Sequence, residues 1–182
     1  MEWLDVVDEK GNPTGELVER TRAHREGVRH RTAHVWLLRL RQGKTEVLLQ
    51  KRSRGKDSHP GCYDISSAGH IPAGVDWLPS ARRELLEELG LEAREEEFAY
   101  RGQRKIYWKD NFYGEPFVDN QVSNVYCLWR DVESEQLRLQ PEEVEEARWM
   151  GLEECREAVR RGSIPNCIAL EELDMLPRTK EM

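Results

Sequence analysis

Residues 69–91 read GHIPAGVDWLPSARRELLEELGL, a loop punctuated by glycines followed by a stretch with helical periodicity. Asp76 can cap the start of a helix over residues 76–89, Pro79 is tolerated in its first turn, and Gly90 suits the position after its end. At 100° per residue, one arc of this helix is apolar. The spacing therefore predicts a buried stripe made of Leu78, Ala81, Leu85 and Leu89.

Three carboxylates of the same helix, those of Glu84, Glu87 and Glu88, gather on a second arc away from the apolar stripe. Like charges three and four residues apart repel, and a divalent cation would turn the repulsion into coordination. Oxygen ligands of this kind suit Mg²⁺ or Mn²⁺. Residues 95–97 and 142–146 are also acidic and read as solvated faces, but only residues 69–91 place a glycine loop beside the carboxylates.

The pattern around this helix predicts a mixed sheet covered by helices. Strands are expected over residues 5–8, 16–20, 33–40, 46–51, 63–67, 121–129 and 146–150, and further helices over residues 152–161 and 166–176. No repeat or low-complexity linker divides the sequence. The prediction is one α/β (α+β) domain over residues 1–182.

Composition excludes several classes of protein. With 28 Lys and Arg against 35 Asp and Glu, the net charge is −7, which disfavours general binding to nucleic acid. The longest apolar run, residues 35–38, is far shorter than a membrane span, and the amino terminus does not resemble a secretory signal. The four cysteines show no metal-site or redox spacing, so a cytoplasmic protein is expected.

Residues 69–91 resemble the Nudix box, G-x5-E-x7-R-E-U-x-E-E-x-G-U with U aliphatic. Eight of its nine defined positions agree, and the departure is Val75, where the box has Glu. Asp76 lies beside Val75 and offers a substitute carboxylate. The resemblance implies a Nudix-type α/β/α sandwich with a mixed central sheet, and chemistry on a diphosphate linked to another group.

The resemblance also implies roles for individual residues. Glu84, Glu87 and Glu88 would bind Mg²⁺ (or Mn²⁺) and activate water, Arg83 would orient them, and the Ala68 carbonyl would be a further ligand. Asp119, or else Glu115, would supply a ligand or the general base, while Asp119 reads equally well as a turn residue. A diphosphate substrate would meet Gly69 and a local basic patch, which contains Arg52, Arg54 and Lys56.

Stretches outside the box, among them residues 5–15, 24–38 and 47–70, are similar to the branch that contains isopentenyl-diphosphate isomerase. That branch has a catalytic cysteine where this chain has Ala68, and a late Glu-x-Glu pair where this chain has Asp119 and Gln121. Both departures favour a hydrolase. The isomerase and a catalytically silent ligand-binding Nudix domain, to which Val75 lends some support, remain the alternatives.

The histidines have two interpretations. His24, His30 and His70 approximate the positions of a histidine metal site in the isomerase branch, but with the thiol and the second carboxylate absent we expect no intact second metal site. His34 lies in an apolar strand and is expected to be a hydrogen-bonded core residue rather than a ligand. The expected partner is a small-molecule diphosphate, and the chain is expected to be a monomer or a homodimer.

Overall fold

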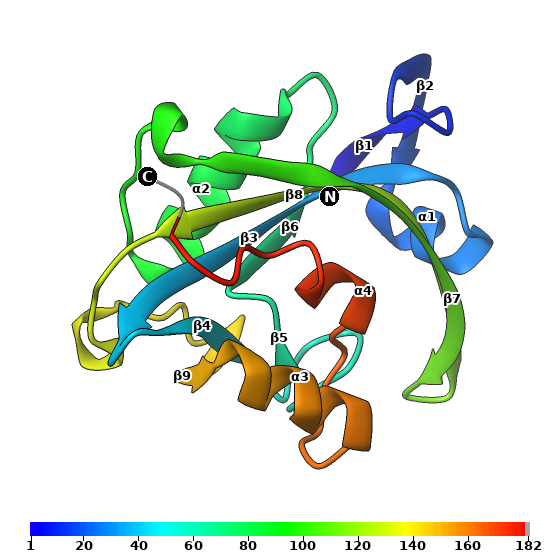
Figure 1. Cartoon of the computed structure of the whole chain (residues 1–182). Coiled ribbons are helices and arrows are strands. Elements are labelled where there is room, and N and C mark those ends of the chain that lie inside the picture. The colour runs from blue at the N-terminus through cyan, green and yellow to red at the C-terminus, as the bar shows by residue number, and fades with distance from the viewer. Residues whose placement is uncertain (181–182) are drawn as a thin grey trace.

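The computed structural model describes residues 1–180, which form two sheets with helices packed around the larger one (Figure 1). The strands are β1 (Trp3–Val7), β2 (Pro13–Glu19), β3 (His30–Arg41), β4 (Lys44–Arg52), β5 (Tyr63–Asp64), β6 (Ser67–His70), β7 (Ala99–Phe112), β8 (Glu115–Trp129) and β9 (Val144–Gly151). The helices are α1 (Arg20–Glu26), α2 (Trp77–Leu89), α3 (Leu152–Arg161) and α4 (Leu170–Leu173), with short 3-10 turns at Glu95–Glu97 and Ser134–Gln136.

The larger sheet is mixed, as predicted. Its strands run in the order β5-β4-β3-β8-β7, with β6 paired to β3 and β9 paired to β4. β3 and β8 are parallel, whereas the other pairs are antiparallel. β1 and β2 form a separate antiparallel hairpin.

Alternation along β3 divides the core into two layers, because successive side chains of a strand point to opposite faces. Val35 and Leu37 pack in the layer that contains Leu85 of α2. Trp36 packs in the opposite layer with Cys155 of α3. The sheet therefore lies between α2 on one face and α3 with α4 on the other, which is the expected α+β sandwich (Figure 1).

Helix α2 follows its prediction closely. It begins after Asp76 and ends at Leu89, and Gly90 closes it in the left-handed conformation with φ 72°. Ala81, Leu85 and Leu89 are buried, while Leu78 is partly covered. Asp76 occupies the N-cap position, but its side chain makes no capping hydrogen bond, so that detail of the prediction is wrong.

Four other elements differ from expectation, one of them α1, a helix that was not predicted. The strand expected over residues 63–67 is two strands, because β5 pairs with β4 and β6 pairs with β3. The helix expected over residues 166–176 shortens to α4, since Asn166 bridges to Tyr63 and the Cys167 N–H donates to the Tyr63 carbonyl. β7 was not predicted: it is a charged edge strand held by its pairing with β8.

The amino-terminal hairpin supports the loop that precedes α2. Asp5 accepts hydrogen bonds from Arg31, at 2.9 Å, and from the Gly74 N–H, also at 2.9 Å. Leu4 is fully buried and bridges to Pro72. A buried ion pair and a buried leucine thus hold the glycine loop against β3.

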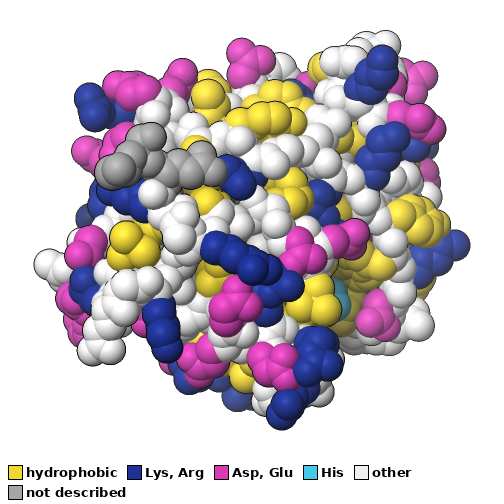
Figure 2. Space-filling view, in the orientation of Figure 1, with side chains coloured by type: hydrophobic (Ala, Val, Ile, Leu, Met, Phe, Trp, Pro, Cys, Tyr) yellow, Lys and Arg dark blue, Asp and Glu magenta, His cyan; other side chains and the backbone are white. Residues whose placement is uncertain are grey.

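None of the helices in the described residues is long and apolar enough to cross a membrane. The face drawn in Figure 2 carries positive and negative side chains interspersed, with small apolar areas between them.

Candidate active site

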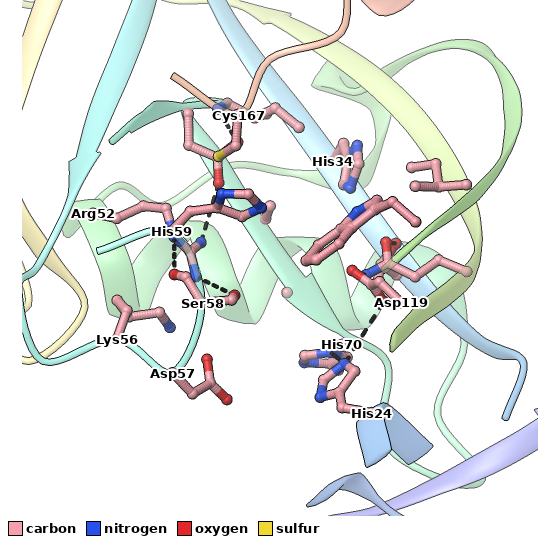
Figure 3. A pocket seen from close by; sticks show the side chains of 18 of the residues that line it. His24, His34, Arg52, Lys56, Asp57, Ser58, His59, His70, Asp119 and Cys167 are labelled. Carbon is pink, nitrogen blue, oxygen red and sulfur yellow. Dashed lines mark hydrogen bonds and ion pairs between the residues drawn. The ribbon is translucent and has the colours of Figure 1, made fainter. Parts of the chain in front are cut away.

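A cavity of about 540 Å³ opens on the sheet face that carries Thr32 and His34 of β3. Its walls come from every part of the chain: α1, the β4–β5 loop, β6, α2, the β7–β8 hairpin and the segment around α4 (Figure 3). Residues predicted to act on a diphosphate therefore meet here, although 67 positions separate Arg52 from Asp119 in the sequence.

Glu84 reaches this cavity by passing directly over the glycine loop. A Cβ placed on Gly69 would lie 2.4 Å from the Glu84 Cδ, so only glycine leaves room for the carboxylate. Burial raises the pKa of Glu84, and a hydrogen bond from Arg83 Nη2 at 3.1 Å opposes the shift. The glycine of the loop is therefore required by the position of a carboxylate on α2.

Glu88, in contrast, is buried beneath the loop. Its Oε1 accepts hydrogen bonds from Ser67 Oγ at 2.8 Å and from the Ala68 N–H at 3.1 Å, and its Oε2 accepts one from Gln50 Nε2 at 3.2 Å. Burial, with repulsion from Glu84, raises the pKa of Glu88 to about 8. The helical wheel placed this side chain off the buried stripe, yet it is 4% exposed.

Glu87 and Arg83 occupy the solvent side of the carboxylate group. Both side chains are half-exposed, and Arg83 Nε lies 3.7 Å from Glu87 Oε1. Arg83 thus contacts both Glu84 and Glu87. Val75, which replaces the first Glu of the box, packs instead against the core layer beneath α2.

The backbone of Ala68 lies next to Glu88. In an extended strand the N–H and C=O of one residue point to the same side, and the Ala68 N–H points to Glu88. The carbonyl therefore points toward α2 rather than toward β3.

A second polar cluster lies next to the glycine loop, where His70 directly follows Gly69. His24, His30 and His70 come from α1, β3 and β6, and their ligand-capable nitrogens all lie within 4.8 Å of one another. Within residues 1–180, these histidines form the group of three possible metal ligands whose atoms lie this close together. The carboxylates of the α2 glutamates do not meet the same distance limit. His30 and His24 are hydrogen-bonded, to the Val28 carbonyl and to His70, and the fold also brings the three rings together from distant segments.

Asp119, at the start of the inward-facing part of β8, completes this cluster. Its Oδ1 lies 3.7 Å from His24 Nε2 (Figure 3). The same oxygen lies 3.7 Å from His30 Nε2. Its Oδ2 accepts a hydrogen bond from Gln121 Nε2 at 2.5 Å. Burial raises the pKa of Asp119 to about 6. Gln121 thereby holds the carboxylate with Oδ1 toward the histidines.

The donor set of this cluster fits a divalent cation. His30 Nδ1 lies 2.9 Å from the Val28 carbonyl, so this nitrogen carries the proton and Nε2 keeps its lone pair. His30 Nε2 and Asp119 Oδ1 are both buried without a hydrogen-bond partner. Burial lowers the pKa of His24 to about 3 and that of His30 to about 4, and lowers the pKa of His70 well below its usual value. Neutral imidazoles beside an unsatisfied carboxylate are the ligands that such an ion prefers.

The predicted basic patch divides in the structure. Arg52 and Lys56 line the cavity, but Arg52 also binds Asp64 at 3.1 Å and Lys56 pairs with Glu143. Arg54 is exposed and lies outside the lining, so its expected contact with substrate is not supported by this geometry. Glu115 likewise lies outside, beside a neighbouring hollow at the hairpin tip.

An aromatic wall closes the cavity on the β7–β8 side. The rings of Trp108 and Phe117 stack with centroids 5.5 Å apart, and His59 meets Trp108 edge-on at 4.9 Å. Tyr113, at the hairpin tip, donates a hydrogen bond to the Lys56 carbonyl at 2.7 Å. The hairpin is thereby joined to the β4–β5 loop across the cavity.

His34 is a hydrogen-bonded buried residue, as predicted, but its partner was not foreseen. Its Nδ1 lies 2.8 Å from Glu172 Oε1. Burial alone would lower the pKa of His34, but the charge and hydrogen bond of Glu172 outweigh burial, so the pKa of His34 is raised. Burial alone would raise the pKa of Glu172, but His34 and Arg104 stabilise its charge, so the pKa of Glu172 is lowered. No local motif marks Glu172, which lies 138 residues from His34.

These features define a class of protein: an α+β domain in which one helix carries carboxylates to a glycine loop beside a deep polar cavity. The family model described as NUDIX domain matches residues 28–167. The chain belongs to the Nudix family.

Curated relatives agree with this assignment. Nudix hydrolase 3 of Arabidopsis thaliana is 37% identical over 158 residues, which cover 85% of this chain but only 20% of that protein. An uncharacterised Nudix hydrolase of Yersinia pestis is 34% identical over 155 residues, covering 85% of this chain and 75% of the relative. A Clostridium acetobutylicum relative is 34% identical over 143 residues, 79% of this chain and 66% of its own length.

Solved structures share the fold. The DR0079 protein of Deinococcus radiodurans superposes with a TM-score of 0.68 at 21% identity, covering 95% of this chain and 98% of its own. An Ap4A hydrolase of C. elegans gives a TM-score of 0.54 at 20% identity, covering 80% and 93%. At these identities the likeness establishes the fold and nothing further.

Proposed function

We propose that this chain is a Mg²⁺-dependent hydrolase that cleaves the diphosphate bond of a nucleoside diphosphate linked to another group, by attack of water at phosphorus. The observation that carries the proposal is the shared cavity: Glu84 and Glu87 line it together with Arg52, Lys56 and Asp119. Carboxylates that bind a cation thus face cations that attract phosphate oxygens.

The proposed metal ligands are Glu84, Glu87, Glu88 and the Ala68 carbonyl, with Mn²⁺ as a substitute for Mg²⁺. When bound, the cation neutralises charge that develops on the diphosphate during cleavage. Arg83 keeps two of the carboxylates in place through its contacts with Glu84 and Glu87.

The substrate and the attacking water are assigned to the same cavity. Gly69, Arg52 and Lys56, which line the cavity, contact the diphosphate. The proton of the water is accepted by Glu87 or Asp119, which also line it, or by Glu88 beneath the loop.

We further propose that His24, His30, His70 and Asp119 bind a second divalent cation. The two unsatisfied buried atoms, His30 Nε2 and Asp119 Oδ1, support this site. The cluster also favours the branch that resembles isopentenyl-diphosphate isomerase, in which histidines stand at similar positions.

Hydrolysis is nevertheless favoured over isomerisation. Ala68 has a methyl group where the isomerases have a thiol, and a methyl group cannot move a proton to or from carbon. The cysteine that lines the cavity, Cys167, comes from the carboxyl-terminal segment, and burial raises its pKa well above the usual value. A thiol that stays protonated in this way is a poor base.

The setting of the enzyme follows the sequence-based predictions. We propose one domain over residues 1–182 that acts in the cytoplasm on a small molecule, as a monomer or a homodimer. General binding to nucleic acid is not proposed, because the net charge is −7.

The test is a product assay with purified protein, Mg²⁺ or EDTA, and a panel of nucleoside triphosphates, nucleotide sugars, dinucleotides, nucleoside-diphosphate alcohols and isopentenyl diphosphate. Mg²⁺-dependent release of a monophosphate is expected, and Glu87→Gln serves as the inactive control. Conversion of isopentenyl diphosphate to its isomer would overturn the proposal. Binding of a diphosphate without turnover across the panel would favour the silent domain.

A further inference from the structure

One buried network beside the cavity has no part in the proposed hydrolysis. Glu172 of α4 is 1% exposed and accepts three hydrogen bonds. The donors are His34 Nδ1 at 2.8 Å, Trp36 Nε1 at 3.0 Å and Arg104 Nη1 at 3.1 Å. A carboxylate with three donors is held rigidly, and each donor is oriented in return.

The network sets the orientation of the His34 ring. Because a carboxylate only accepts, the nitrogen facing Glu172 carries a hydrogen, which makes Nδ1 the protonated position. Glu172 thus engages Nδ1, one of the two ring nitrogens of His34. Nε2 is thus the ring atom left for a ligand, and His34 lines the cavity (Figure 3).

The position of His34 on the sheet places it among the proposed metal ligands. On β3 it follows His30 and Thr32 on the same face, since alternate residues of a strand share a face. Its partner across the β3–β6 ladder is Ala68, and the partner of Thr32 is His70. A diphosphate held between α2 and the histidine cluster therefore lies within reach of this face.

We propose that His34 is a substrate-contacting residue whose Nε2 forms a hydrogen bond to an oxygen of the bound diphosphate, and that Glu172 is the positioning residue that holds the ring. The choice of a diphosphate as the ligand rests on the proposed function. It is compatible with either protonation state of the ring: an imidazolium donates to a phosphate oxygen, and a neutral ring accepts from a protonated oxygen.

The test uses the full chain with Mg²⁺ and methylenediphosphonate, a diphosphate that cannot be hydrolysed, by isothermal titration calorimetry. The decisive variant is His34→Asn, because the asparagine amide can still donate to Glu172 but has no atom at the position of Nε2. Loss of a hydrogen bond to a charged group predicts a dissociation constant raised about tenfold or more. Glu172→Gln, which no longer holds the ring by charge, is expected to weaken binding to a smaller degree.

The matched control is Glu171→Gln. Glu171 is the neighbouring residue, its side chain is 77% exposed, and it pairs with Arg104 rather than with His34. We expect the dissociation constant of Glu171→Gln for methylenediphosphonate to stay within about twofold of the wild-type value, because an exposed ion pair contributes little. An equal loss in Glu171→Gln and Glu172→Gln would overturn the positioning role.

Long-range ¹H–¹⁵N spectra of the wild-type histidines test the contact without relying on a variant. We expect a protonated Nδ1 at His34 before the probe is added and a shift of the Nε2 resonance afterwards. An unmoved Nε2 resonance, wild-type affinity in His34→Asn, or failure of wild type to bind the probe would overturn the inference. A shifted Nε2 in a protein that hydrolyses no diphosphate would retain the subsite and refute only the hydrolase.

Discussion

Replacing Glu88 by glutamine should make the metal-free protein more stable and the enzyme inactive. In the folded chain, burial raises the pKa of Glu88 to about 8, from 4.5 for an ordinary glutamate. The folded protein without metal therefore keeps this carboxyl protonated at neutral pH. Glutamine has the same shape as the protonated acid and can still accept hydrogen bonds from Ser67 and the Ala68 N–H.

The size of the effect follows from the two pKa values. Between pH 4.5 and about 8 the unfolded chain has lost a proton that the folded chain retains, so the stability of wild type falls as the pH rises. At ~1.4 kcal/mol per pH unit, this costs wild type about 3 kcal/mol at pH 7, and the loss levels off above pH 8. Glu88→Gln escapes the loss because glutamine does not titrate.

The measurement is urea unfolding of both proteins in EDTA at several pH values. The two proteins should have similar free energies of unfolding at pH 4. As the pH rises from 4 to 8, the free energy of unfolding of the variant should increasingly exceed that of wild type. Mg²⁺ should reduce the stability advantage of the variant, since the cation binds the charged carboxylate of wild type. The variant should also lose at least ~10²-fold in kcat. A stability difference that does not change with pH would refute the raised pKa of the buried Glu88 carboxyl.

Three further perturbations test other parts of the site. Gly69→Ala places a Cβ 2.4 Å from the Glu84 Cδ, so displacement of the carboxylate should cost about 10²-fold in kcat, while the circular dichroism spectrum stays that of wild type. Gly90→Ala, at φ 72° and with a Cβ 2.7 Å from the Arg138 Cβ, should lower the free energy of unfolding by ~1–3 kcal/mol without altering kcat of the folded enzyme. Asp119→Asn should weaken Mn²⁺ at the histidine cluster by about 10–100-fold in titration calorimetry, and unchanged affinity would exclude Asp119 as a ligand.

Local signals predicted the parts of this protein whose partners are near in sequence. α2 forms where the apolar spacing and Gly90 placed it, and α3 ends at Arg161 before Gly162 as expected. β7 escaped prediction because its stability comes from pairing with β8, not from its own apolar pattern. The helix expected over residues 166–176 failed for the same reason, since Cys167 bonds to Tyr63, 104 residues away.

The sequence by itself determined the family, the carboxylate helix and the glycine that the helix requires, because these depend on spacings within 23 consecutive residues. Tertiary structure alone decided that Glu88 is buried, that three histidines from α1, β3 and β6 converge on Asp119, and that Glu172 orients His34. These outcomes depend on contacts between segments far apart in the chain. The free energies of these contacts depend on burial and on neighbouring charges in the folded interior, and no local pattern of residues predicts them.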